Sequence, residues 1–117
     1  MKRFTVWIDH HVAHILEYKT NGIVFSDYSA KEKGMPSKEH QKQFYHEVAE
    51  ALNGADKVLV LGPGMAKEEF RNHCEAHHSS VDKAIFKVES MKAHPSRDEI
   101  LKFSAPFYKK YFEWEGT

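Results

Sequence analysis

An uninterrupted apolar run that leads directly into a glycine-proline-glycine turn most restricts how this chain can fold. The run is Lys57–Leu61, the turn is Gly62-Pro63-Gly64, and a helical pattern begins at Met65. β-Branched and leucine residues without polar alternation are typical of a strand buried on both faces, and such strands occur in parallel sheets covered by helices. The sequence therefore predicts an α/β core.

The rest of the chain supplies the other elements of such a core. Runs of β-formers predict five strands, at Phe4–Asp9, Val12–Tyr18, Ile23–Tyr28, Lys57–Leu61 and Ala84–Val88. Apolar residues at helical spacing predict three helices, at Glu39–Leu52, from about Met65 to His77, and from Ser96 onward. The order β-β-β-α-β-α-β-α joins a three-stranded antiparallel meander to two parallel strands in one mixed five-stranded sheet, a ribonuclease H-like arrangement.

Local signals fix three boundaries within this order. Asn21-Gly22 lies between two strand patterns and is a strong signal for a hairpin. Ser96 and Glu99 have the spacing of a capping box, so the last helix is expected to begin there. Pro106 falls inside that helix and is expected to kink or split it, because proline has no backbone N–H to donate.

Length and composition favour a single domain spanning residues 1–117, since a chain of this size supports one core. Lys plus Arg equal Asp plus Glu at 17 each, which argues against a generally basic nucleic-acid binder and against DNA as a partner. Phosphate binding would have to come from a local patch. With one cysteine and no apolar segment of about 18 residues, we expect a cytoplasmic protein without a membrane span.

Two regions are candidates for binding RNA or another anion. A polar segment broken by Gly34 and Pro36 precedes the first predicted helix, and the segment and helix start carry Lys31, Lys33, Lys38 and Lys42. Lysines grouped in this way neutralise phosphates with salt-dependent affinity. The second candidate is the glycine turn, where Gly62 and Gly64 free the backbone beside Lys67 at a helix N-terminus. The alternative for the lysine-bearing segment is a solvated loop that binds nothing. The alternative for the glycines is a tight turn that holds no ligand.

Carboxylates give little support for a nuclease. Two-metal nucleases gather several carboxylates at the carboxyl ends of central strands. Asp9 ends the first predicted strand, but the fourth ends at Leu61-Gly62 without one. We expect Asp9 to accept local backbone hydrogen bonds in a turn, and we assign no catalytic residue.

Histidines and the cysteine give no clear metal site either. Of His10, His11 and His14, at most two share one face of a strand. His73 and His77 are four residues apart, but the glutamate of a zinc-protease helix is missing because Cys74 follows His73. Cys74 falls on the apolar stripe and is expected to pack in the core. The sequence thus predicts no metal ligand and no cofactor.

Three segments carry a resemblance to a known family: Val6–His10 with Ala13, Phe44–Ala49 and Val60–Phe70. They resemble the middle domain of class-1 peptide chain release factors and Pelota. More closely, the chain resembles the small stand-alone bacterial proteins called translational machinery proteins. The resemblance covers nearly the whole chain, and it implies a ribonuclease H-like fold and a partner in ribosomal or transfer RNA.

The catalytic motif of release factors does not carry over. In those proteins a Gly-Gly-Gln tripeptide on the loop before the first helix directs water to the peptidyl-tRNA ester. Here that loop contains only Gly34, and Gln41 falls within the predicted helix start. The resemblance therefore implies a non-catalytic translation-associated module that binds the ribosome or transfer RNA.

Two alternatives remain open at this point. One is a protein-interaction or homodimerisation domain that uses the aromatic residues near the C-terminus, Phe107, Tyr108, Tyr111, Phe112 and Trp114. The other is a hydrolase or metal-dependent nuclease, although this sequence lacks the residues expected for either activity.

Overall fold

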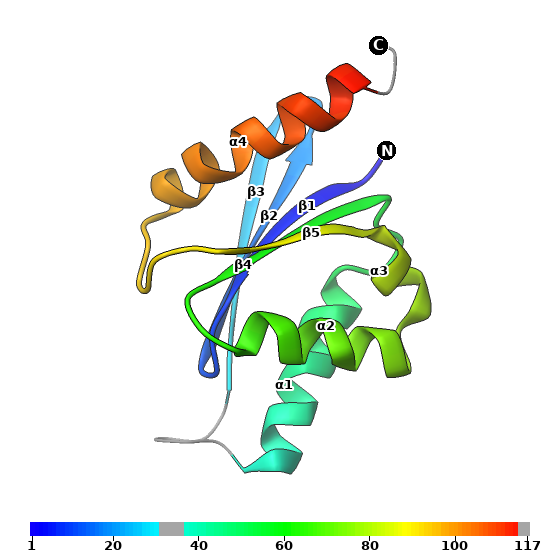
Figure 1. The fold of residues 1–117 in the computed structure, drawn as a ribbon, viewed down its shortest axis with the longest axis vertical. Helices are drawn as coiled ribbons and strands as arrows, with labels where there is room; N and C mark the ends of the chain where they lie inside the picture. Colours follow the sequence, from blue (N-terminus) through cyan, green and yellow to red (C-terminus); the bar gives the residue numbers. More distant parts are fainter. Residues whose placement is uncertain (31–36, 115–117) are drawn as a thin grey trace.

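Five strands form one mixed sheet with the order β3-β2-β1-β4-β5 in the computed structural model, which describes residues 1–30 and 37–114 (Figure 1). The strands are β1 (Arg3–Ile8), β2 (Val12–Lys19), β3 (Gly22–Ser29), β4 (Lys57–Gly62) and β5 (Ile85–Ser90). β1, β2 and β3 pair antiparallel, whereas β4 pairs parallel with both β1 and β5. The predicted meander with two added parallel strands, in a ribonuclease H-like arrangement, is confirmed.

Four helices accompany the sheet in the described residues, where the sequence predicted three. They are α1 (Lys38–Ala51), α2 (Ala66–His77), α3 (Ser79–Ala84) and α4 (Arg97–Trp114). The helix count was wrong because α3 has only six residues, less than two turns, which is too short to establish a 3.6-residue period. The observed order is thus β-β-β-α-β-α-α-β-α.

The sheet has a helical layer on each face. α1, α2 and α3 cover one face and α4 covers the other (Figure 1). Because successive side chains of a strand point to opposite faces, Val6 and Ile8 of β1 pack in the first core while Trp7 between them packs in the second. All three are fully buried. The central strands therefore belong to two hydrophobic layers at once.

The predicted boundary signals are found at the hairpin and at the start of α4. Gly22 pairs with Lys19 at the end of the hairpin and has a φ of +146°, which favours glycine. The Ser96 N–H donates to Glu99 Oε1 at 2.9 Å, and the Glu99 N–H donates to Ser96 Oγ at 3.1 Å. This reciprocal pair is the predicted capping box.

Pro106 does not split α4, which runs from Arg97 to Trp114 as one helix. A proline removes the hydrogen bond to the carbonyl four residues earlier, here Lys102. Pro106 and Lys102 are both exposed, so water can solvate the freed carbonyl and the helix continues. Across the described ranges, none of the helices is both long enough and apolar enough to cross a membrane.

Candidate functional site

The turn between β4 and α2 is shaped first by packing. A methyl group added at Gly62 would lie 2.2 Å from the carbonyl oxygen of Ile8, so β4 passes the end of β1 at a distance that only glycine allows. The Gly62 carbonyl accepts a hydrogen bond from the Met91 N–H at 3.0 Å. Around Gly64, by contrast, nothing lies within 4 Å of an added methyl group. The close approach thus explains the first glycine of the turn.

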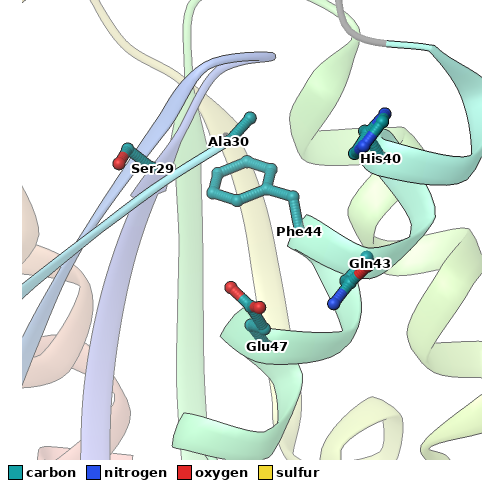
Figure 2. A pocket seen from close by; sticks show the side chains of 6 residues that line it. All are labelled: Ser29, Ala30, His40, Gln43, Phe44 and Glu47. Atoms are coloured by element: carbon teal, nitrogen blue, oxygen red, sulfur yellow. The ribbon is translucent and has the colours of Figure 1, made fainter. Parts of the chain in front are cut away.

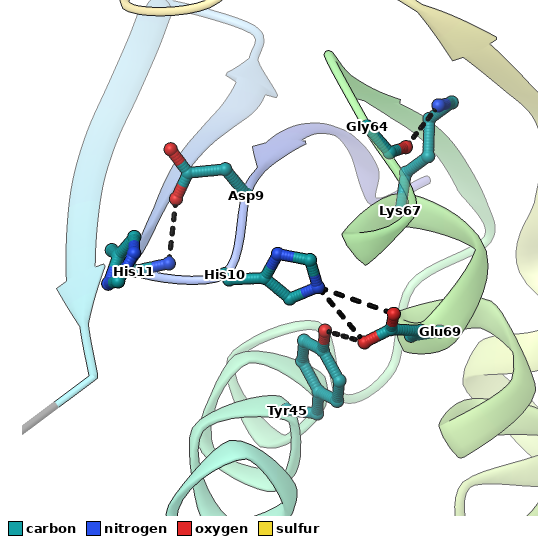
Figure 3. A network of polar contacts seen from close by, with 7 residues as sticks. All are labelled: Asp9, His10, His11, Tyr45, Gly64, Lys67 and Glu69. Carbon is teal, nitrogen blue, oxygen red and sulfur yellow. Dashed lines mark hydrogen bonds and ion pairs between the residues drawn. The ribbon is translucent and has the colours of Figure 1, made fainter. Parts of the chain in front are cut away.

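Lys67 folds back onto this turn. Its side chain is buried, with 7% exposure, and its ammonium donates a hydrogen bond to the Gly64 carbonyl (Figure 3). Glu68 and Glu69 lie in the first turn of α2, where they interact favourably with the helix dipole. The structure thus brings Gly62, Gly64 and Lys67 together, and anion binding by them stays a prediction.

Asp9 serves as a turn residue beside this site, as predicted. Its Oδ1 accepts hydrogen bonds from the N–H groups of His11 at 2.8 Å and Val12 at 2.7 Å (Figure 3). The carboxylate therefore holds the β1–β2 connection in shape, which is the common use of aspartate in such turns.

The histidines of this hairpin point to separate partners. His10 Nε2 lies 3.2 Å from Glu69 Oε1, which also accepts a hydrogen bond from the Tyr45 hydroxyl at 3.0 Å (Figure 3). Burial and the contact with Glu69 raise the pKa of Tyr45 above its usual range. His14 Nδ1 instead contacts Asp27 Oδ1 at 2.7 Å. His10 and His14 do not converge on one point.

The start of α1 presents the predicted lysines that the structure describes. Lys38 and Lys42 are exposed one turn apart and border an open hollow of about 360 Å³, together with Glu39, Gln41 and Tyr45. The helix is capped by Ser37, whose hydroxyl accepts a hydrogen bond from the His40 N–H at 3.3 Å. Lys31 and Lys33 lie outside the described residues.

A second hollow lies on α1 where it meets the end of β3 (Figure 2). Its volume is about 10 Å³, enough for about one water molecule. The Phe44 ring occupies the space between the helix and the strand. The hollow is lined by Ser29, Ala30, His40, Gln43, Phe44 and Glu47. This hollow therefore suits no small-molecule ligand.

Sequence reasoning missed a cluster of three histidines. One ring nitrogen from each of His46, His73 and His78 lies within 4.8 Å of the other two. His46 comes from α1, His73 comes from α2 and His78 directly follows α2, so the last two lie about 30 residues after His46. The signal for a convergence of this kind is tertiary packing of two helices, which spacing along the chain does not reveal.

Cys74 lies beside this cluster in sequence but faces the core. It is fully buried, and burial raises the pKa of its thiol to about 12. The prediction that Cys74 packs in the core is confirmed.

Comparison with known proteins relates the fold to translation factors. No protein-family model matches the chain. The Pelota homolog of Methanocaldococcus jannaschii is 28% identical over 97 residues, which cover 80% of this chain and 26% of that protein. The chain thus spans about a quarter of the length of the curated relative it matches.

Solved structures agree with this match. The archaeal Pelota in a model of ribosome-bound Pelota and ABCE1 has a TM-score of 0.70 at 19% identity, covering 88% of this chain and 31% of that one. Archaeoglobus fulgidus Pelota has a TM-score of 0.64 at 19% identity, covering 89% and 31%. The archaeal termination factor aRF1 has a TM-score of 0.58 at 17% identity, covering 97% and 40%. The chain therefore has a fold like that of a Pelota and release-factor middle domain.

Proposed function

We propose that this chain is a non-catalytic, translation-associated module that binds the ribosome or transfer RNA through the start of α1 and the loop before it. The observation that carries the proposal is the likeness to Pelota, which extends over 80% of the chain in sequence and 88% in structure. One of those structural neighbours is described as ribosome-bound. A ribosomal partner also implies a cytoplasmic location.

Four lysines supply the phosphate contacts in this proposal. Lys38 and Lys42 are exposed on neighbouring turns of α1, and Lys31 and Lys33 precede them in the sequence. The N-terminal end of α1 also carries the positive end of the helix dipole, which favours a phosphate nearby. Because the chain has zero net charge, binding through these lysines is local rather than general.

The turn at Gly62, Gly64 and Lys67 is a second, weaker contact. Its lysine already donates a hydrogen bond to the Gly64 carbonyl, and Glu68 and Glu69 place two carboxylates at the same helix end. Those carboxylates repel an approaching phosphate. We therefore assign most of the RNA affinity to Lys38 and Lys42 of α1 and to Lys31 and Lys33, which precede this helix in the sequence.

Co-sedimentation with ribosomes and, separately, with transfer RNA tests the proposal. Four phosphate contacts predict that affinity falls roughly 50- to 150-fold between 50 and 200 mM salt. In the test variant, glutamate replaces each of the four lysines, Lys31, Lys33, Lys38 and Lys42, which reverses their charge. The matched control reverses four exposed lysines elsewhere, Lys19, Lys87, Lys102 and Lys109, which changes the net charge equally.

We expect the α1 variant to lose binding and the control to keep it. Equal loss in both variants would show that net charge, rather than this surface, attracts the RNA. Binding that is absent at both salt concentrations would overturn the proposal and direct the search to protein partners. Transfer RNA and ribosome results, read separately, identify which of the two is the partner.

A further inference from the structure

The histidine cluster has the donor atoms and the spacing of a metal site. One ring nitrogen from each of His46, His73 and His78 lies within 4.8 Å of the other two, and His46 Nδ1 and His78 Nε2 are hydrogen-bonded at 3.2 Å. Zinc–nitrogen bonds of 2.0–2.1 Å at a tetrahedral angle hold two ligand nitrogens about 3.3 Å apart. One edge of the required tetrahedron is thus already formed. Because His46 is exposed, a small side-chain rotation can close the remaining distance.

Neighbouring buried residues anchor the backbone beside two of the three histidines. Tyr45, adjacent to His46, packs with its ring 6.0 Å from the His73 ring, and Cys74, adjacent to His73, is fully buried. α2 ends at His77, and His78 leaves the helical conformation with φ of −139° and ψ of 67°. The His78 ring nevertheless stays close to α2, with its centroid 5.3 Å from that of the His73 ring. Rigid supports of this kind favour a preorganised site.

His73 contributes a ring nitrogen whose hydrogen-bonding capacity is unsatisfied. Its Nε2 atom is buried and has no hydrogen-bond partner among the described residues. A neutral imidazole offers a lone pair, whereas a protonated one does not. A buried nitrogen without a partner is costly, and a metal ion would satisfy it.

The surroundings supply an outer partner and an open position. Glu50 Oε1 lies 3.7 Å from His46 Nε2, on the side of the ring away from His78. Carboxylates beside a ligating histidine commonly fix its orientation and raise its basicity. The cluster borders an open hollow of about 510 Å³ that His77 and Lys42 also line, so His77 or water can complete the coordination. The Lys42 ammonium opposes a cation there and lowers the affinity.

We propose that His46, His73 and His78 bind a divalent transition-metal ion of the zinc type. Imidazole ligands suit zinc, nickel, copper and iron, whereas magnesium and calcium prefer oxygen ligands. The ion joins α1 to the end of α2 and stabilises the packing of the two helices. This site shares Lys42 with the proposed RNA contacts, but its test requires no ribosome.

Binding of ZnCl₂ to the purified chain, measured by isothermal titration calorimetry at pH 7.5, is the direct test. We expect one zinc ion per chain. At a free zinc concentration 100 times the dissociation constant, the melting temperature should rise by about 10 °C, and a chelator should reverse the shift. Co²⁺ in place of zinc should give the visible absorption of a four-coordinate ion.

Single substitutions separate this site from the other histidines. His46→Asn and His78→Asn each remove one ligand from a position that tolerates a polar residue, and each should weaken binding by more than the roughly 10- to 100-fold typical of losing an outer partner. Glu50→Gln should weaken it less. The controls, His11→Asn and His94→Asn, remove exposed histidines and should bind zinc like the unaltered chain.

Three results would overturn the proposal. One is the absence of stoichiometric zinc binding by the unaltered chain at micromolar concentration. Another is unchanged binding in both His46→Asn and His78→Asn. The third is an equal loss in the two controls, which would show that scattered surface histidines hold the metal.

Discussion

Single residues in this fold differ sharply in how much their position restricts them, and the two glycines of the β4–α2 turn illustrate the range. Gly62 lies against the backbone of Ile8, whose carbonyl cannot move without displacing β1. Gly64 faces open space and has no positive φ. The same residue type is therefore required at one position and replaceable two residues later.

Replacing each glycine by alanine tests this difference. Gly62→Ala should lower the free energy of unfolding by about 1–3 kcal/mol, the usual cost of overpacking. Gly64→Ala should leave it unchanged or raise it by about 0.4–1 kcal/mol, because alanine restricts the unfolded chain more than glycine does. Urea denaturation of both variants measures the difference. Equal effects would contradict the close approach seen at Gly62.

Glu99 provides a residue-scale prediction for pH. Its hydrogen bond to Lys92, together with the Ser96 N–H, lowers the pKa of Glu99 to about 2 from the 4.5 of an unperturbed glutamate. A carboxyl whose pKa is depressed by folding stabilises the fold above pH 4.5, and that contribution disappears as the pH falls to about 2.

The substitution Glu99→Gln should therefore lower the urea midpoint at pH 7 and have little effect at pH 2. Glu75→Gln, at an exposed position on α2, serves as the control and should change the midpoint little at either pH. A difference between Glu99→Gln and the unaltered chain that persists undiminished at pH 2 would refute this account.

At the scale of elements, α4 is attached to the sheet by polar contacts as well as by its apolar face. The Tyr18 hydroxyl shares hydrogen bonds with Thr5 Oγ1 at 3.0 Å and with Ser104 Oγ at 2.7 Å, and Ser104 donates to the Leu101 carbonyl. Thr5 and Ser104 are fully buried. Such a chain is stable while every member is paired and costly when one is removed.

Removal of the central hydroxyl should thus loosen α4. Tyr18→Phe removes the hydroxyl that Thr5 and Ser104 share and should cost about 1–3 kcal/mol of stability, whereas Ser104→Ala should cost about 1 kcal/mol. Because the two residues share a bond, the double variant should lose less than the sum. Thermal unfolding of all four proteins measures the coupling, and strict additivity would contradict it.

Elements differ in how well sequence alone predicts them. The five strands and their order follow from β-forming runs, the Asn21-Gly22 hairpin and the handedness of crossovers. α3 was missed because Ser79-Ser80 is typical of a loop and six residues show no period. The predicted break at Pro106 was wrong because α4 can continue where water solvates the freed carbonyl, and the exposure of that position depends on tertiary structure. The histidine cluster depends on how α1 packs on α2, which local patterns do not contain.

The whole molecule consists of two helical layers that share one sheet. β1 and β4 place alternate residues in each core, as Val60 and Leu61 do from neighbouring positions of β4. Neither layer keeps its hydrophobic partner if the central strands separate. The two cores should therefore unfold together rather than in sequence.

Two probes test this cooperativity, one confined to the α4 layer and one that reports the helices of both layers. Trp7 is fully buried in the α4 layer, and in a Trp114→Phe variant it becomes the sole tryptophan. Its fluorescence and the far-UV circular dichroism, which includes α1 and α2, should give coincident urea transitions. Separate midpoints would show that the layers unfold independently.

The burial of Cys74 has a practical consequence for following this protein at work. Since its thiol is inaccessible and has a pKa of about 12, the natural chain should react poorly with maleimide dyes at neutral pH. A new cysteine at the exposed α4 position, Lys109→Cys, would then carry a single fluorophore. That face lies across the sheet from α1 (Figure 1). Single labelled molecules could therefore be followed by fluorescence without a dye close to the lysines of α1.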